Sequence, residues 1–147
     1  MGASGTLGAG VAETPLRVVV AEDDEKLATL VCETLDADGR FIVVGRASNG
    51  HDAVVLVEEH EPDLVLMDIG MPGLDGIAAT RAIRARDVGQ HVVIYTGSDE
   101  YADIARADEA GAAGFLHKDA LGSPDLPDAL HVLHTNYLRA RLEDEGV

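Results

Sequence analysis

Five short apolar runs, each followed by a helical pattern, restrict the folds that this sequence can adopt. The runs lie at 16–21, 41–44, 64–67, 92–95 and 113–117, and the first of them is rich in β-branched residues. Between them, apolar residues recur three or four positions apart, which is the spacing of one face of a helix. Strands and helices that alternate in this way form a parallel sheet with helices on both faces. We therefore predict an α/β fold, a (βα)5 doubly wound parallel five-stranded sheet with right-handed crossovers and the flavodoxin-like order 2-1-3-4-5.

The rest of the 147-residue chain leaves no room for a second domain. Residues 1–14 are rich in glycine and alanine without periodicity, so we predict a flexible N-terminal segment there. The predicted domain spans residues 15–141. Residues 142–147 then form an acidic tail, which is too short for a further folded module.

The charge balance and the single cysteine exclude several classes of protein. The chain has 11 Lys and Arg residues against 27 Asp and Glu residues, a formal net charge of −16. Such a charge repels phosphates, so we expect no nucleic-acid binding by this chain alone. Cys32 is the only cysteine, which excludes a disulfide framework and fits a reducing compartment. No apolar run approaches the ~18 residues that span a membrane. We therefore expect a cytoplasmic protein without membrane contact.

Polar side chains follow the predicted strands at the edge where this fold binds ligands. In doubly wound sheets, that edge lies beyond the carboxyl ends of the strands. The first strand is followed by Glu22 and Asp23, the third by Asp68, the fourth by Thr96 and the fifth by Lys118. Three carboxylates at one edge repel each other, and a hard divalent cation such as Mg²⁺ relieves that repulsion. The sequence therefore predicts a magnesium site.

Asp68 and Lys118 indicate phosphoryl chemistry at this edge. Asp68 opens a tight turn at 68–73 that contains two glycines and a proline. A carboxylate held beside a metal can attack phosphorus and form an aspartyl phosphate. Lys118 would neutralise the phosphoryl oxygens, and Thr96 would donate its hydroxyl to one of them. Each residue also has an ordinary interpretation as a helix cap, a loop acid, a surface lysine or a strand threonine, and for Asp24 a helix N-cap is the predicted role.

Four segments carry a resemblance to a known family over roughly residues 16–134. The most specific one reads Pro-Asp-Leu-Val-Leu-Met-Asp-Ile-Gly-Met-Pro-Gly-Leu-Asp-Gly, and the four lie at 62–76, 18–24, 95–97 and 111–120. The sequence resembles the receiver domain of bacterial two-component response regulators. Asp119 stands where many receivers have proline after the lysine, which is similar to the NarL/LuxR-like subfamily with its helix-turn-helix output domain. The resemblance is compatible with an excised receiver of a LuxR-type transcription regulator and with a stand-alone receiver.

The resemblance implies a phosphoacceptor and its metal ligands. Asp68 would take a phosphoryl group from the phosphohistidine of a sensor histidine kinase. Mg²⁺ would be bound by Asp68 itself, directly by Asp23 and through water by Glu22. The backbone carbonyl of Gly70 would complete the protein ligands.

The resemblance also implies a conformational switch. Thr96 and Phe115 would form the switch pair, in which the hydroxyl moves to the phosphoryl group and the ring turns inward. Gly97 would leave room for the phosphoryl group, and Lys118 would form an ion pair with it. Phosphorylation would then favour a surface that binds a partner or a second copy of the chain as a homodimer. That surface would involve the fourth helix, fifth strand and fifth helix, or the first and fifth helices.

Two alternatives share the fold or the chemistry. A phosphorylation-independent binding module on the same fold usually lacks one of the acids, the threonine or the lysine, and all of them are present here. A phosphatase of the haloacid dehalogenase class would need a second aspartate two residues after the nucleophile, where this chain has Gly70. We therefore predict a phosphoacceptor signalling domain, not an enzyme, which catalyses only its own phosphorylation and dephosphorylation.

Overall fold

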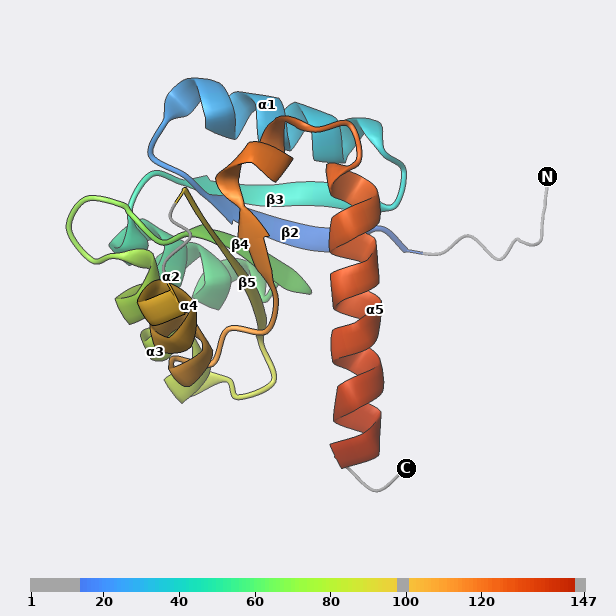
Figure 1. The fold of residues 1–147 in the computed structure, drawn as a ribbon. Helices are drawn as coiled ribbons and strands as arrows, with labels where there is room; N and C mark the ends of the chain where they lie inside the picture. The colour runs from blue at the N-terminus through green and yellow to red at the C-terminus, as the bar shows by residue number, and fades with distance from the viewer. Residues whose placement is uncertain (1–13, 98–100, 145–147) are drawn as a thin grey trace.

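The computed structural model describes residues 14–97 and 101–144, so most of the predicted N-terminal segment and the end of the predicted tail lie outside the described residues. Strands and helices alternate along the described chain (Figure 1). In chain order, the elements are β2 (Leu16–Ala21), α1 (Glu25–Ala37), β3 (Phe41–Ala47), α2 (Gly50–His60), β4 (Leu64–Asp68), α3 (Gly76–Arg86), β5 (His91–Thr96), α4 (Tyr101–Glu109), β6 (Phe115–His117), the 3₁₀ helix η1 (Lys118–Gly122) and α5 (Leu126–Asp144).

The strands form one parallel sheet in the order β3-β2-β4-β5-β6. Counted along the chain, this is the order 2-1-3-4-5, so the predicted doubly wound, flavodoxin-like topology is confirmed. Helices α1 and α5 cover one face of the sheet, and α2, α3 and α4 cover the other (Figure 1). In the described part of the chain, no helix is both long and apolar enough to cross a lipid bilayer.

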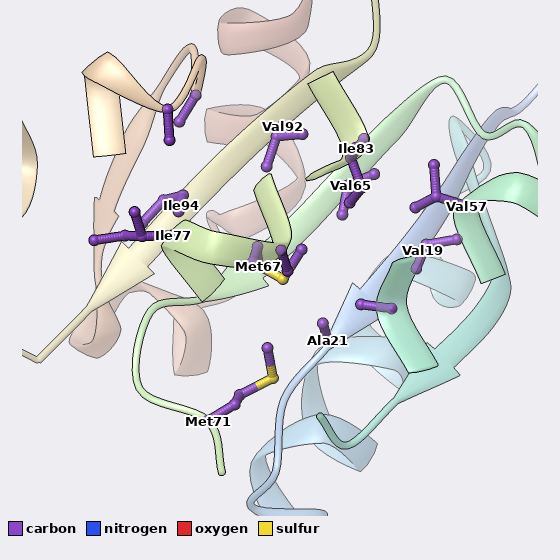
Figure 2. Close-up of a cluster of buried hydrophobic side chains, with 14 of the residues drawn as sticks. Val19, Ala21, Val57, Val65, Met67, Met71, Ile77, Ile83, Val92 and Ile94 are labelled. Atoms are coloured by element: carbon purple, nitrogen blue, oxygen red, sulfur yellow. The ribbon is translucent and has the colours of Figure 1, made fainter. Parts of the chain in front are cut away.

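Both faces of the sheet are buried, which explains why its central strands are uniformly apolar. In β2, Val19 and Ala21 belong to the core under α2, α3 and α4, and Val18 and Val20 belong to the core under α1 and α5. All four side chains are completely buried. Figure 2 shows the first of these cores, to which α2 contributes Val57.

Near the C-terminal end of the described chain, the bounds of the last strand and the last helix differ from those that the sequence predicts. The apolar run at 113–117 predicts a longer strand than β6. The Ala113 amide still donates to the Val92 carbonyl at 2.8 Å, but Gly114 has a φ of 121°, a left-handed conformation that interrupts the regular strand. At the C-terminal end, α5 continues to Asp144, so the first residues of the predicted acidic tail are helical.

A buried histidine pair joins α5 to the beginning of β5. His91 Nε2 lies 2.6 Å from the Ala113 carbonyl oxygen, and His91 Nδ1 lies 2.9 Å from His134 Nδ1. Because a carbonyl only accepts, His91 must carry its proton on Nε2, and His134 must donate to His91 Nδ1. The His91 ring stacks on Tyr137 with a centroid distance of 4.1 Å. Burial lowers the pKa of His91 to about 4 and also lowers the pKa of His134.

We expect this pair to make the folded protein sensitive to acid. Between pH 6.5 and about 4, the unfolded chain binds a proton at His91 and the folded chain does not. The contribution of His91 to stability therefore falls as the pH falls. A shift of this size corresponds to about 3 kcal/mol. The measurement is urea unfolding across this range for the parent and for His91→Phe, whose ring can still stack on Tyr137. Relative to the variant, the parent should lose stability on acidification. If the unfolding free energies of the two proteins change in parallel with pH, the assigned effect of His91 is contradicted.

Candidate functional site

Three carboxylates meet where β2 and β4 end. Ala21 of β2 and Met67 of β4 are register partners, so the residue that follows each of them, Glu22 and Asp68, comes to the same edge of the sheet. One ligand oxygen from each of Glu22, Asp23 and Asp68 lies within 4.8 Å of the other two. Glu22 is 2% exposed and Asp68 is 3% exposed, whereas Asp23 is open to solvent. The sequence-predicted cluster is therefore assembled by strand register.

Within the part of the chain that the structure describes, one carboxylate oxygen of Asp68 is buried without a hydrogen-bond partner. Asp68 Oδ1 accepts from the Gly70 amide at 3.1 Å, whereas Oδ2 is the one buried side-chain polar atom among the described residues that has no hydrogen-bond partner. Lys118 Nζ lies 3.7 Å from that oxygen and 3.8 Å from Glu22 Oε1. Burial raises the pKa of Asp68 to about 6, and repulsion from Glu22 adds to the effect although the Gly70 amide and Lys118 oppose it. The site therefore has excess negative charge and an oxygen available for a cation.

The donor set of this cluster suits Mg²⁺. It consists of carboxylate oxygens, which hard divalent cations prefer. Because Asp23 is exposed, one side of the cluster is accessible from solvent. The partnerless Asp68 Oδ2 is an oxygen that such a cation would satisfy. The residues present therefore fit the ion that the sequence predicts.

The loop after Asp68 is held by the beginnings of two helices. A Cβ atom on Gly76, the first residue of α3, would overlap the Asp68 carbonyl oxygen. A Cβ atom on Gly50, the first residue of α2, would overlap the carbonyl oxygen of Leu74 in the loop. Only glycine permits these approaches without displacing the backbone. Asp75 then caps α3 by accepting from the Ala78 amide at 2.8 Å.

The remaining predicted residues lie around the same edge, with one exception. Thr96 ends β5 and is partly exposed. Gly97 is exposed, and a Cβ atom there would lie 4.0 Å from Lys118 Cδ, so the space beside the lysine is open. Gly70 is exposed in the turn after Asp68. Phe115 is the exception, because it lies at the start of β6 and packs against the core under α2, α3 and α4.

Two further contacts orient the acid cluster. Asp24 caps α1 as predicted, accepting from the amides of Lys26 and Leu27 at 3.0 and 3.2 Å. Its own amide donates to Glu22 Oε2 at 2.8 Å. The buried Tyr95 hydroxyl donates to Glu22 Oε1 at 2.7 Å, a contact that sequence reasoning missed. The available signal was a tyrosine at the end of the otherwise aliphatic run 92–95, directly before Thr96.

Comparison with known proteins identifies the family. The model of the response regulator receiver domain matches residues 18–131, which is most of the chain. This chain belongs to the response regulator receiver domain family. It is therefore a receiver domain of two-component response regulators, a module of phosphorelay signalling, as the sequence analysis predicts. Receiver domains are phosphoacceptor signalling domains.

The most similar relatives include regulators of two kinds. The chain is 33% identical over 119 residues to the nitrate/nitrite response regulator protein NarL of Escherichia coli K12, covering 81% of this chain and 55% of that protein. It is 36% identical over 114 residues to the chemotaxis protein CheY of Halobacterium salinarum, covering 78% of this chain and 92% of that protein. The receiver domain thus spans about half the length of the NarL relative.

Solved structures show the same architecture. The signal receiver domain of the response regulator NarL from Mycobacterium tuberculosis superposes with a TM-score of 0.78 at 33% identity, covering 84% of this chain and 98% of that chain. A LuxR-family response regulator from Aurantimonas gives a TM-score of 0.77 at 29% identity, covering 84% of this chain and 87% of that chain. The resemblance to NarL-type receivers therefore holds in sequence and in structure.

Proposed function

We propose that this receiver domain accepts a phosphoryl group on Asp68 in a Mg²⁺-dependent reaction. The observation that carries the proposal is the buried Asp68 carboxylate, whose Oδ2 lacks a hydrogen-bond partner among the described residues and lies 3.7 Å from Lys118. A carboxylate held in this way can form a bond to phosphorus while the bond from phosphorus to the donor nitrogen breaks. The electron pair of that bond then leaves with the imidazole of the donor.

The acid cluster would hold the metal during this transfer. Glu22, Asp23, Asp68 and the Gly70 carbonyl are the proposed ligands, with Glu22 acting through water. When bound, Mg²⁺ supplies positive charge to the phosphoryl oxygens. The cluster distances and the oxygen-only donor set support this assignment.

Four residues would bind the phosphoryl group and couple its presence to a conformational change. Lys118 is already beside Asp68 and would pair with the phosphoryl oxygens. The Thr96 hydroxyl would donate to one of them, and Gly97 leaves the space open. Phe115 would turn inward as Thr96 moves, which would shift the population towards an active surface.

The proposal also names partners and a location. The donor is a sensor histidine kinase in the cytoplasm, and the activated surface binds a partner or a second copy of the chain. The sequence similarity to NarL supports a receiver of the class found in LuxR-type transcription regulators, and DNA binding by such a regulator would belong to another domain. Beyond its own phosphorylation and dephosphorylation, we propose no catalytic activity for this chain.

The test is intact mass after incubation with acetyl phosphate and Mg²⁺. We expect the parent to gain one phosphoryl group, and we expect Asp68→Asn, or the parent in EDTA, to gain none. If a folded parent gains none from acetyl phosphate or from a phosphorylated histidine kinase, the proposal fails and the phosphorylation-independent binding module is favoured. A gain that persists in Asp68→Asn would contradict the assignment of the acceptor.

A further inference from the structure

A buried tyrosine extends from β5 to the acid cluster across an intervening strand. Tyr95 is the register partner of Asp68 on β4, and β4 separates β5 from β2. The Tyr95 hydroxyl nevertheless reaches the Ala21 carbonyl at 3.1 Å and Glu22 Oε1 at 2.7 Å, both at the end of β2. Tyr95 is completely buried, so its ring lies beside Asp68 inside the core and its polar end forms part of the site.

The Glu22 carboxylate is fixed by donors on both oxygens. Oε2 accepts from the Asp24 amide, and Oε1 accepts from Tyr95. Lys118 Nζ is 3.8 Å from Oε1, which is beyond hydrogen-bond distance. A phenylalanine at position 95 would fill nearly the same space but would remove the short contact to Oε1. Glu22 would then be free to rotate about its remaining bond to the Asp24 amide.

We infer that Tyr95 is a positioning residue of the metal site, whose hydroxyl holds the Glu22 carboxylate in the orientation that binds Mg²⁺ beside Asp68. This inference rests on the proposed function, because it concerns the same site. Groups that orient metal ligands typically change metal affinity by about 10- to 100-fold when removed. Because Glu22 is proposed to act through water, we expect the lower end of that range.

The experiment is a titration with MgCl₂ followed by amide NMR spectra. Tyr95→Phe is compared with Tyr137→Phe, which also removes a tyrosine hydroxyl bond, in this case to the Gly89 carbonyl at 2.9 Å beyond the opposite end of β5. We expect Tyr95→Phe to weaken Mg²⁺ binding about 10-fold and Tyr137→Phe to leave it within about twofold. Before Mg²⁺ is added, the Asp24 amide proton should already shift in Tyr95→Phe, because it donates to Glu22.

A double-mutant cycle with Glu22→Gln separates positioning from simple core packing. If Tyr95 acts through Glu22, Tyr95→Phe should cause no further loss of Mg²⁺ affinity in the Glu22→Gln background. An additive loss, or an unchanged affinity in Tyr95→Phe while Asp23→Asn binds weakly, would overturn the inference and leave the proposed function intact. A folded parent that does not bind Mg²⁺ would instead overturn the proposed function itself.

Discussion

Gly76→Ala should destabilise the receiver domain by about 3 kcal/mol or more, as expected for a side chain forced into a closed core. The added methyl group would overlap the Asp68 carbonyl oxygen and would also approach Ile69 Cα. Both contacts are backbone atoms, so no side-chain rotation can relieve them. Either α3 or the loop after Asp68 must shift, and the Gly76 amide would then lose its bond to the Ile69 carbonyl.

Urea unfolding and the phosphorylation assay together test this expectation. The matched control is Gly39→Ala, because a Cβ atom at Gly39 meets nothing within 4 Å. We expect the control to stay within about 0.5 kcal/mol of the parent. We also expect Gly76→Ala to phosphorylate more slowly than the control under conditions where both are folded. Equal stability of the two variants would show that the loop adapts more easily than the close approach indicates.

Asp68→Asn should stabilise the metal-free protein by about 2–3 kcal/mol at neutral pH, although it removes the proposed acceptor. Burial raises the pKa of Asp68 from 3.8 to about 6, so the folded state binds this proton more tightly than the unfolded state does. Stability from the protonated group is complete below pH 3.8 and is lost as the pH rises through about 6. Asparagine has nearly the shape of aspartate but no charge, so the Asp68→Asn variant should not lose this stability as the pH rises.

The measurement is urea unfolding in EDTA at several pH values. The advantage of Asp68→Asn over the parent should be small near pH 4 and should grow to its full size by about pH 7. Added Mg²⁺ should narrow the gap, because it stabilises the parent by about 1.4 kcal/mol at ten times its dissociation constant. A stability difference between Asp68→Asn and the parent that stays constant across the pH range would contradict the assigned effect of the Asp68 charge.

The fold could be predicted because burial on both faces leaves a clear pattern in the sequence. Val18 to Ala21 are apolar without alternation because each faces one of two cores. The convergence of Glu22, Asp68 and Lys118 could also be predicted, since parallel topology alone brings strand ends to one edge. The late start of the last strand, at Phe115, could not be predicted, because it depends on the positive φ that Gly114 adopts in the folded chain.

Tyr95 shows the limit of sequence reasoning at the site. Within the run 92–95, a tyrosine reads as another buried strand residue, and its strand position indicates only which face it occupies. Its contact with Glu22 depends on lateral reach past β4, which is a property of the assembled sheet. Side chains that act at a distance of two strands leave no spacing signal along the chain.

His91 at the beginning of β5 and Asp68 at the end of the neighbouring β4 titrate with opposite effects on stability, which has a consequence for any profile of stability against pH. On acidification from about pH 6 to pH 4, the contribution of His91 to stability falls while that of Asp68 rises, each by about 2 kcal/mol. In metal-free buffer, these contributions largely compensate, so a nearly level profile would conceal two large effects. Exchanging either residue alone should tilt the profile, and the direction of the tilt would tell which of the two residues had been changed.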